Sequence, residues 1–574
     1  MIFSCIRKLW HILEIKRKYQ VIALIISMLI ASIAEAISIG LLGPFLAIIS
    51  SPENTLQIHG IHIEILIQKI FNHKVDVMFL SLIFCVSVGF SAFIRLSVLA
   101  FQTRLSYSIG KDINQMLFIS IANRNYEKHI SVNSSESISA ITTKSNNFIL
   151  FSIVPLFLIT NSFLYLILLV ALMLYINPIL TLSSSILIIT TYFLFWMITR
   201  RAVSTSAKNI NYFQTNVVKI ASELINSYRD AIVGGKRLYF VDLFCKSDAK
   251  LKEDQAKITL IGNFPRYIIE SVVLIGMVIA ISITTGTTGA IQIAELGVIA
   301  LAAQKILPIV QQGYLNITYL RANINGATDI LEPILSKEVG KNYEDEGPEF
   351  NIKQGVELRM VSYEYPNGRI ALNEINQKFE WQKIYGIKGS TGSGKTTLID
   401  LVLGLIFPTN GGSVVAGGVV LNQSTARYWH RYISHVPQFI YLCDATVAEN
   451  IAFGLPISQI DMDRVRHCAR IAQIDDVISS WPMGYRTNVG ESGVALSGGQ
   501  KQRIGIARAI YEYSKVLILD EATSALDDLT EKTLMAAIHK ELKDITVIMI
   551  AHRTSTLNNC DVIITLENGK VIVG

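Results

Sequence analysis

The chain separates into a strongly hydrophobic N-terminal part and a C-terminal part in which hydrophobic and polar positions alternate over short distances. The most hydrophobic stretch runs from Ser145 to Thr199, 55 residues without a single Asp, Glu, Lys or Arg. A helix needs about 20 apolar residues to cross a bilayer, so this stretch is long enough for two crossings. The pattern therefore excludes a purely soluble enzyme and predicts an integral membrane protein.

Similar hydrophobic runs predict six membrane-spanning helices in the first half of the chain. They lie at about 20–49, 77–101, 148–172, 178–199, 266–284 and 290–311. The third and fourth are joined by the turn pair Asn177-Pro178, and the fifth and sixth by a Gly/Thr loop over Thr284–Gly289. Charged residues are rare within these helices: Glu35 is the only one in the first, and Arg95 lies in the second.

Basic residues near the ends of the hydrophobic runs predict the orientation in the membrane. Five Lys and Arg precede the first helix, and the fourth helix runs directly into Arg200 and Arg201. The segments 102–147 and 200–265 are therefore expected on the cytoplasmic side of the inner membrane. The first 18 residues are expected there too, as an amphipathic elbow on the inner leaflet. Both long segments have mostly helical patterns and are expected to bend near their tips, at 125–130 and 227–235.

A change in composition near Ser336 predicts a second domain. Residues 336–350 are polar and acidic, as is typical of a linker, which divides the chain into a membrane domain at 1–335 and a globular domain at 351–574. Short β-branched runs alternate there with helical patterns, for example at Gly355–Val361, Ile384–Ile387, Ile433–Val436, Val516–Leu519 and Thr546–Ile550. This alternation predicts an α/β fold with a mostly parallel sheet covered by helices.

Composition and charge narrow the possibilities further. Of the 574 residues, 51% are hydrophobic and 17% are charged, and the formal net charge is +6. This charge is modest for the length and does not indicate a nucleic-acid partner, whereas the basic cytoplasmic loops of a membrane protein explain it. The six cysteines are scattered and form no C-x-x-C pair, which argues against a structural zinc site or a disulfide framework.

The first candidate site is a glycine-rich loop in the C-terminal domain. Gly389–Thr396 reads G-x-x-x-x-G-K-T and stands between an apolar run and the helical pattern at Leu398–Leu405. The glycines let backbone N–H groups surround a phosphate, and the following helix directs its positive end to the same anion. Lys395 is expected to neutralise the β- and γ-phosphate oxygens of ATP, and Thr396 to bind Mg²⁺.

Two further segments complete a site for phosphoryl transfer. The apolar run Val516–Leu519 ends in Asp520 and Glu521, which places both carboxylates at the edge of the sheet where ligands bind. Asp520 is expected to reach Mg²⁺ through water, and Glu521 to polarise the attacking water. Ser497–Gln500 begins a helical pattern and predicts a second anion cradle. Because one domain does not need two cradles for one phosphate, the second is expected to serve a nucleotide bound to another subunit.

These motifs carry a family resemblance. Residues 355–574 resemble the nucleotide-binding domain of ATP-binding cassette (ABC) transporters. The membrane half resembles that of exporter half-transporters with six spans. The resemblance therefore implies a membrane protein with the ABC exporter fold, in which an all-α domain of six transmembrane helices is joined to an α/β P-loop NTPase domain. It also implies that Leu496–Gln500 is the ABC signature.

Roles for single residues follow from the same resemblance. Tyr365 would stack on adenine, Gln438 would bind Mg²⁺ and couple the domains, and His552 would sense the γ-phosphate. Ser524–Asp527 would link the two sites, and Glu491 would touch the membrane domain. The expected ATP contacts are Tyr365, Gly389, Ser390, Thr391, Gly392, Ser393, Gly394, Lys395, Thr396, Thr397, Ser497, Gly498, Gly499 and Gln500; the expected Mg²⁺ ligands are Thr396, Gln438 and Asp520; the expected catalytic residues are Glu521, His552, Gln438 and Lys395.

A narrower resemblance concerns the transported molecule. Segments at Asn125–Lys128, Pro265-Arg266 and Lys305–Pro308 are similar to bacterial flippases for lipid-linked oligosaccharides. Such a lipid carries a diphosphate, and cations at membrane depth are costly unless they are used. Arg95, Arg266 and Lys305 are therefore candidates to receive that diphosphate.

Structural roles stay open for the same charged residues. Arg266 and Glu270 are four positions apart on one helix face and can neutralise each other. Arg95 and Lys305 can extend their charged ends toward the membrane surface. Glu35 can hold a hydrogen bond between helices instead of touching a substrate.

The function implied by the resemblance is ATP-driven export or flipping, most simply by a homodimer, because each chain has one phosphate loop and one signature. The tips at 125–130 and 227–235 would be coupling helices that dock on the nucleotide-binding domains. An exporter of peptides or drugs fits nearly the same features. An ATP-gated channel or a regulatory membrane module is a third possibility, against which the complete catalytic residues argue. Relatives usually continue past the position of Gly574 through a short helix, so the packing of this end stays open.

Overall fold

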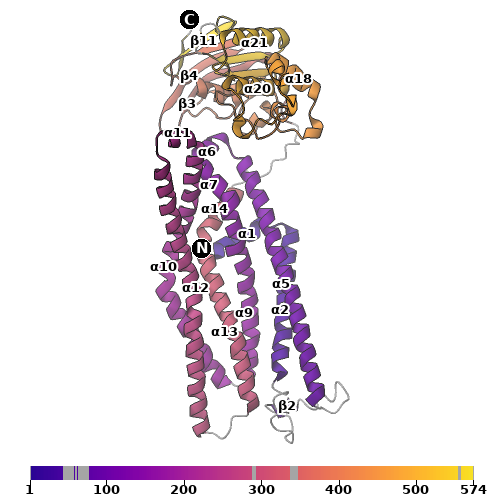
Figure 1. Ribbon diagram of the computed structural model, residues 1–574, viewed down its shortest axis with the longest axis vertical. Coiled ribbons are helices and arrows are strands. Elements are labelled where there is room, and N and C mark those ends of the chain that lie inside the picture. The colour runs from indigo at the N-terminus through magenta and orange to yellow at the C-terminus, as the bar shows by residue number, and fades with distance from the viewer. Residues whose placement is uncertain are drawn as a thin grey trace. The chain divides into compact units, whose positions relative to one another are not determined.

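The computed structural model describes residues 2–42, 57–58, 61–62, 77–176, 178–287, 293–335, 347–551, 553 and 557–572. Its contacts divide the chain into two compact units (Figure 1). The helical unit comprises Met1–Arg124 and Lys128–Lys341, and the C-terminal unit comprises Asn125–Glu127 and Asn342–Gly574.

The described residues up to Leu335 form mainly long helices that run side by side (Figure 1). The long ones are α2 (Ile15–Gly40), α5 (Val77–Ala122), α9 (Val154–Ile176), α10 (Pro178–Asn226), α12 (Arg237–Thr287) and α13 (Ile293–Ala322). The shorter ones are α1 (Ile2–Ile12), α6 (Tyr126–Ser131), α7 (Ser134–Ser139), α8 (Ser145–Phe148), α11 (Tyr228–Val233) and α14 (Ile324–Leu335). The π-helical turns η1 (Ala140–Lys144) and η2 (Ile149–Ile153) connect α7, α8 and α9, and β1 (Gln57–Ile58) pairs with β2 (Ile61–His62).

The six predicted spans fall on the six long helices. Four stretches among the described residues have the length and hydropathy of a membrane crossing, namely Ile15–Gly40, Ser81–Ala122, Ser134–Tyr175 and Ser184–Asn226. The helices continue well beyond the hydrophobic runs, as the patterns of segments 102–147 and 200–265 predict. Residues 43–49 of the first span, Asn177 of the predicted turn and residues 288–292 lie outside the described part of the chain.

The predicted loop between the fifth and sixth spans is partly wrong. Thr284–Thr287 continue α12 instead of leaving it. A single glycine, here Gly286, costs a helix only about 1 kcal/mol relative to alanine. Extending an existing helix is also easier than starting one, so the 51-residue helix α12 tolerates this segment.

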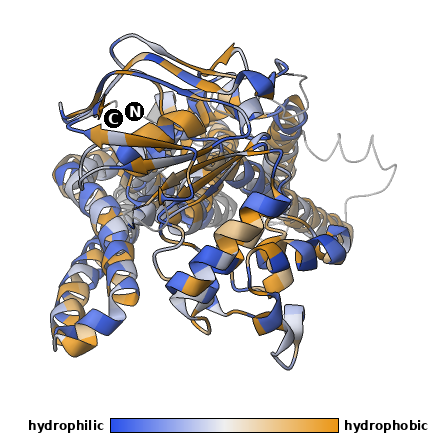
Figure 2. Cartoon of the chain, turned by 90° about the horizontal axis from the view of Figure 1, so that it is seen from above, coloured by the Kyte–Doolittle hydropathy of each residue, from blue (hydrophilic) through white to orange (hydrophobic). Residues whose placement is uncertain are grey.

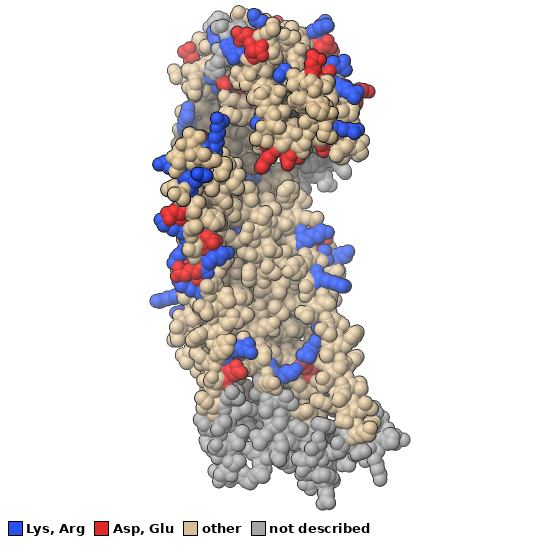
Figure 3. All heavy atoms as spheres, viewed as in Figure 1, with Lys and Arg blue, Asp and Glu red and all other residues tan. Residues whose placement is uncertain are grey.

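The helical unit is held together by apolar contacts with a few ion pairs. A buried cluster joins α1, α2, α5, α9 and α14 and includes Leu24, Met28 and Ile109. The Arg17 Nε donates to the Asp112 Oδ2 at 2.6 Å and ties α2 to α5. On the face drawn in Figure 3 much of this unit is free of charged side chains, and acidic and basic residues gather along the edge formed by α12. Uncharged surface is what a lipid environment requires.

The C-terminal unit has the predicted α/β fold. Its main sheet has the strand order β12-β11-β5-β10-β9-β8, in which all pairs are parallel except β11 with β12. The strands are β5 (Ile384–Lys388), β8 (Ile433–Val436), β9 (Val516–Asp520), β10 (Thr546–Ile550), β11 (Val562–Glu567) and β12 (Lys570–Ile572). They are predominantly hydrophobic (Figure 2), as expected of a parallel sheet covered on both faces.

A second, antiparallel sheet was not predicted from the sequence. Its order is β4-β3-β6-β7, with β3 (Val356–Glu364), β4 (Ile370–Phe379), β6 (Ser413–Ala416) and β7 (Val419–Val420). The helices of this unit are α15 (Lys395–Leu403), α16 (Ala426–Trp429), α17 (Val447–Ile451), α18 (Met462–Ile471), α19 (Asp475–Ser479), α20 (Gly498–Tyr511) and α21 (Asp528–Glu541). One buried cluster joins both sheets with α15, and another joins the opposite face of the main sheet with α17, α18, α20 and α21.

Candidate nucleotide site and charged membrane cluster

The glycine-rich loop leaves β5 and enters α15 along a path that requires glycine. Gly392 and Gly394 have φ values of +81° and +105°. A Cβ atom on Gly394 would lie 2.7 Å from the carbonyl oxygen of Ala371, and one on Gly389 would lie 2.3 Å from that of Leu566. Any side chain at these two positions would force the backbone to move. The loop thus has the conformation that its motif predicts for binding a phosphate.

The side chains of Lys395 and Ser393 fit a phosphate ligand. Lys395 is 9% exposed, and its Nζ donates to the carbonyl oxygens of Gly389 at 2.8 Å and Ser390 at 2.9 Å. Ser393 is 3% exposed, and its Oγ has no hydrogen-bond partner among the described residues. A buried hydroxyl without a partner is costly, and a phosphate oxygen would supply the acceptor that it lacks.

Three predicted residues come together at the carboxyl edge of the main sheet. Asp520 ends β9, Glu521 follows it with a φ of +50°, and Gln438 follows the neighbouring strand β8. The Gln438 Nε2 donates to the Glu521 Oε2 at 2.7 Å. The carboxyl ends of parallel strands are where α/β proteins bind ligands. The positive φ of Glu521 is a strained conformation of the kind that accumulates at functional sites.

An additional carboxylate near this edge was missed by sequence reasoning. Burial, with the nearby Asp520 carboxylate, raises the pKa of Asp400 to about 7. Burial also raises the pKa of Asp520, with Glu521 acting in the same direction and the Lys395 ammonium against it. The available signal was spacing, because Asp400 lies four residues after Thr396 and thus on the same face of α15. Carboxylates crowded in this way favour a bound cation.

Tyr365 lies against the first turn of α15. Its Oη and the Thr397 Oγ1 are 3.0 Å apart, and its ring packs edge-on against Tyr363 with centroids 5.1 Å apart. The sequence predicted both Tyr365 and Thr397 as nucleotide contacts but not that they touch each other. The contact places the aromatic ring beside the helix that follows the phosphate loop.

The predicted second cradle is a capped helix start. Ser497 and Gln500 form a capping box at the N-terminus of α20, in which the Ser497 N donates to the Gln500 Oε1 at 2.9 Å and the Gln500 N donates to the Ser497 Oγ at 3.3 Å. The Gln502 side chain also bonds Ser524 and the backbone N of Ala525. The helix that begins with the predicted signature is therefore in direct contact with the predicted linking loop.

Two of the predicted residues contribute little to the described site. His552 lies outside the described residues. Glu491 is exposed and begins the 3-10 turn η6 (Glu491–Gly493).

Inside the helical unit, a buried carboxylate joins two of the three candidate substrate cations. Glu35 on α2 is 3% exposed, and its Oε1 accepts from the Arg95 Nη1 at 2.8 Å and from the Lys305 Nζ at 3.0 Å. The expected bond between helices is therefore present and joins α2, α5 and α13. The Arg95 and Lys305 side chains are 47% and 43% exposed, so both can reach a further anion.

The third candidate cation has a different setting. The Arg266 Nε lies 4.0 Å from the Glu270 Oε2 on the same face of α12, and both side chains are about half exposed. This arrangement is the mutual neutralisation considered above. Arg266 thus faces its own helix neighbour, whereas Arg95 and Lys305 share Glu35.

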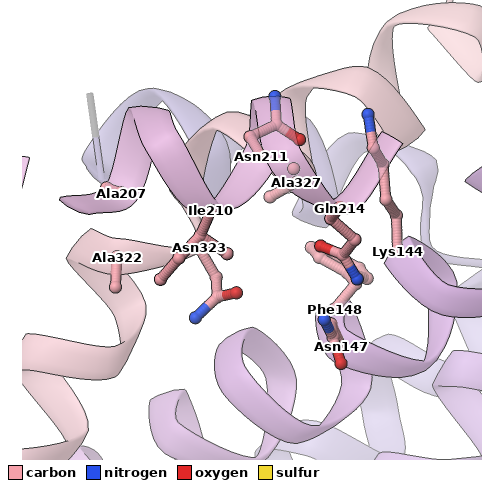
Figure 4. Close-up of a pocket in the computed structure, with 11 residues that line it drawn as sticks. Lys144, Asn147, Phe148, Ala207, Ile210, Asn211, Gln214, Ala322, Asn323 and Ala327 are labelled. Carbon is pink, nitrogen blue, oxygen red and sulfur yellow. The ribbon is translucent and has the colours of Figure 1, made fainter. Parts of the chain in front are cut away.

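A small polar pocket lies between α8, α10 and the α13–α14 junction (Figure 4). Asn147, Asn211, Gln214 and Asn323 contribute amides, and the Lys144 Nζ donates to the Asp329 Oδ2 at 2.7 Å beside it. The volume of about 10 Å³ is enough for one water molecule at most. This pocket is therefore too small for a substrate. The ion pair between Lys144 and Asp329 beside it connects α14 to the rest of the helical unit.

A buried histidine in β8 predicts acid sensitivity of the C-terminal unit. Burial lowers the pKa of His435 to about 4, from a usual value of 6.5. The unfolded chain therefore binds more protons than the folded one below pH 6.5, and stability falls as the pH decreases from 6.5 to 4. The difference is worth up to about 3 kcal/mol. We expect His435→Gln to reduce this loss, measured as the unfolding temperature of the full-length chain at pH 7, 5.5 and 4.5.

The matched control for this experiment is His467→Gln, which removes an exposed histidine from α18. It should respond to acid like the unaltered chain. An identical acid response of the His435 and His467 variants would contradict the prediction.

Comparisons with known proteins agree with this architecture. Residues 372–524 match the family model described as ABC transporter. The ATP-dependent lipid A-core flippase of Ralstonia nicotianae is 42% identical over 214 residues, which cover 37% of this chain and 36% of the relative. The flippase of the same name from Legionella pneumophila is 31% identical over 379 residues, which cover 65% of this chain and 63% of the relative. The chain thus aligns with less than two thirds of the length of these relatives.

A solved structure shows the fold of the whole chain. A bacterial Atm1-family ABC exporter with ATP bound matches 97% of this chain and 94% of its own length with a TM-score of 0.79, at 18% sequence identity. The predicted exporter fold, in which a helical membrane domain is followed by an α/β domain, is therefore confirmed.

Proposed function

We propose that this chain, an ABC transporter half with the exporter fold, uses ATP to flip or export an anionic, amphiphilic lipid-linked molecule across the inner membrane. The observation that carries this proposal is the hydrogen bond between Gln438 and Glu521 at the sheet edge that receives the phosphate loop. It joins Glu521, which is proposed to orient the attacking water, to Gln438, which is proposed to bind Mg²⁺ and couple the domains. ATP hydrolysis would be coupled to transport through this pair of residues.

Each residue of the nucleotide site has a proposed role. Lys395 and the loop Gly389–Gly394 bind the β- and γ-phosphates, and Glu521 orients the attacking water. Mg²⁺, when bound, neutralises charge on the phosphate oxygens. The described residues contain no cluster of three His, Cys, Asp or Glu that could hold a metal. Mg²⁺ would therefore be held by the oxygens of Thr396, Gln438 and Asp520 together with those of ATP, which is how Mg²⁺ usually binds in nucleotide sites.

We infer that the active form is a homodimer. α15 and α20 belong to different buried clusters of the C-terminal unit. The Ser497–Gln500 cradle is therefore proposed to bind the γ-phosphate of ATP held by the partner. Tyr365 would stack on adenine of the chain's own ATP, and His552 would respond to its γ-phosphate.

Coupling to the membrane domain is proposed to run through α6 and α11. Within the C-terminal unit, the Tyr363 Oη donates to the Glu127 Oε1 at 3.0 Å, and Tyr363 packs on Tyr365. A side chain from the first tip thus touches the residue next to the proposed adenine contact. This contact supports α6 as a coupling helix.

An anionic glycolipid is the proposed substrate. Arg95, Lys305 and Glu35 together carry one net positive charge, and the two cations keep exposed surface. Both relatives described above are named flippases for lipid A-core. A charge of this sign at membrane depth is costly unless it is used, which supports a phosphate-bearing lipid over an uncharged drug.

Removing either cation tests the substrate. We expect Arg95→Gln and Lys305→Gln each to raise the glycolipid concentration needed for half-maximal ATPase stimulation about tenfold, as the loss of about 1.4 kcal/mol of binding would. Each single variant leaves Glu35 with its other partner, so the buried carboxylate is not left unpaired. The measurement is ATPase activity and ATP-driven lipid translocation in proteoliposomes containing a lipid-linked oligosaccharide or lipid A-core.

The control is Arg104→Gln, because Arg104 is an exposed cation on the same helix as Arg95. It should leave the stimulation curve unchanged. If peptides or drugs stimulate the ATPase activity and neither glycolipid does, the chain would be an exporter of peptides or drugs instead. Nucleotide binding without ATP-driven translocation of any of these would favour a channel or regulatory module.

A further inference from the structure

Two arginines from different helices stack on one tryptophan at the end of the uncharged stretch. The guanidinium carbons of Arg200 on α10 and Arg321 on α13 lie 5.6 and 5.3 Å from the ring centroid of Trp196. Cation–π attraction holds each arginine in place. It also brings two like charges to the same ring, which is unfavourable unless an anion joins them.

In the ranges that the structure describes, two buried polar groups near this ring lack hydrogen-bond partners, and the two arginines lack a carboxylate partner. Among the described residues neither Arg200 nor Arg321 forms an ion pair with a carboxylate. The Trp196 Nε1 and the Tyr192 Oη are buried, and within the same described part of the chain neither has a hydrogen-bond partner. A negatively charged acceptor would satisfy the two guanidinium groups and the buried Trp196 Nε1 together. Planar guanidinium groups recognise phosphate best of the common anions.

The cavity at this ring continues into a much larger apolar one. The cavity at the ring has a volume of about 270 Å³, and Trp196, Arg200 and Arg321 are among the residues that line it. It shares Tyr192, Tyr314 and Ile317 with a cavity of about 710 Å³ between α9, α10 and α13, whose lining is mostly aliphatic. The larger volume is within the range of about 300–1,000 Å³ that is usual for ligand sites. Together the cavities are charged at one end and apolar along the rest.

The position along the chain indicates where the ligand comes from. Arg200 is the first charged residue after the stretch Ser145–Thr199, and Arg201 follows it. Basic residues at this boundary lie at the cytoplasmic surface of a membrane, which carries anionic lipids. A molecule with a phosphate at that depth and an acyl chain reaching into the bilayer has the dimensions and polarity of the combined cavity.

We infer that Trp196, Arg200 and Arg321 form a binding site for an anionic glycerophospholipid of the cytoplasmic leaflet. Its phosphate lies between the two guanidinium groups, and one acyl chain fills the apolar cavity between α9, α10 and α13. This lipid is a resident ligand and not the transported molecule. The inference therefore stands apart from the proposed function, and either can fail without the other.

Bromine-labelled lipids test the site, because bromine in an acyl chain quenches the fluorescence of a tryptophan in contact with it. The full-length chain is titrated in detergent with brominated phosphatidylglycerol and, separately, with brominated phosphatidylcholine of the same chains. We expect saturable quenching by phosphatidylglycerol that disappears in Trp196→Phe. The zwitterionic lipid should bind at least about tenfold more weakly, a difference of about 1.4 kcal/mol.

Charge variants then separate the site from general membrane affinity. Arg200→Gln and Arg321→Gln should each weaken phosphatidylglycerol binding about tenfold. Arg201→Gln, which removes the neighbouring exposed cation, should not change it. Arg200→Lys and Arg321→Lys keep the charge, and should bind with intermediate affinity because lysine lacks the planar fork. If a glutamine variant does not fold, these lysine variants can still be used to measure the contribution of each guanidinium group.

Several outcomes would overturn the inference. Equal quenching by both lipids, or an unchanged affinity in Arg200→Gln and Arg321→Gln, would show that no phosphate site exists. Displacement of phosphatidylglycerol by the transported glycolipid would make this a substrate site. Quenching that is absent in the dimer but present in diluted monomer would show that a second copy of the chain occupies the cavity.

Discussion

Replacing Glu521 with glutamine is expected to stop ATP turnover while preserving ATP binding. The carboxamide has nearly the shape of the carboxylate and can keep the bond to the Gln438 Nε2, now 2.7 Å long, by presenting its oxygen. It cannot accept a proton from the attacking water. Groups that orient or deprotonate a nucleophile contribute about 10²–10⁴-fold, so phosphate release by the full-length chain in proteoliposomes should fall at least about 100-fold.

The same variant should accumulate as an ATP-bound dimer. If hydrolysis opens the dimer, blocking it leaves nucleotide held between the loop of one chain and the Ser497 cradle of the other. Size-exclusion chromatography with ATP and Mg²⁺, together with retention of labelled ATP, measures this. Glu541→Gln removes an exposed carboxylate from α21 and should turn over normally. A Glu521→Gln protein with full turnover would refute the assigned role.

The sequence predicted those parts of the fold that depend on local patterns. The strands Ile433–Val436 and Thr546–Ile550 were placed to the residue. Thr546–Ile550 is apolar after its first residue, as is typical of a buried parallel strand. The antiparallel sheet containing β3 was missed. Its strand β4 has mostly exposed or partly exposed positions with a few buried ones between them. In the sequence alone, such a mixed pattern resembles that of a loop.

The sites could be predicted only where a motif fixes them. The glycines at 392 and 394 follow from the backbone path that a phosphate loop needs, and their positive φ values agree. Contacts across large sequence separations carry no local signal. The bonds of Glu35 to Arg95 and Lys305 span 60 and 270 positions. From the sequence alone, each of these cations is therefore compatible with a substrate role and with a structural role. The stacking of Arg321 on Trp196 was hidden for the same reason.

Replacing Lys395 with alanine should strongly weaken ATP binding and, with it, every later step. The Lys395 Nζ now donates to the carbonyl oxygens of Gly389 and Ser390, so it fixes the loop as well as supplying charge. Hydrogen bonds to a charged group are worth about 1.5–3 kcal/mol each. Losing them from the phosphates should weaken ATP binding by about 10- to 100-fold, as measured by titration with a fluorescent ATP analogue.

Lys388→Ala separates the role of position 395 from the loss of positive charge near the loop. Lys388 ends β5, one residue before the loop, and is exposed. If the loop acts through a directed ammonium, Lys388→Ala binds ATP normally and Lys395→Ala does not dimerise with ATP and Mg²⁺. If both variants lose affinity equally, general electrostatic attraction would explain binding, and the cradle built by Gly389, Ser393 and Lys395 would have no special part in it. Continued ATP hydrolysis by Lys395→Ala would contradict the nucleotide site as a whole.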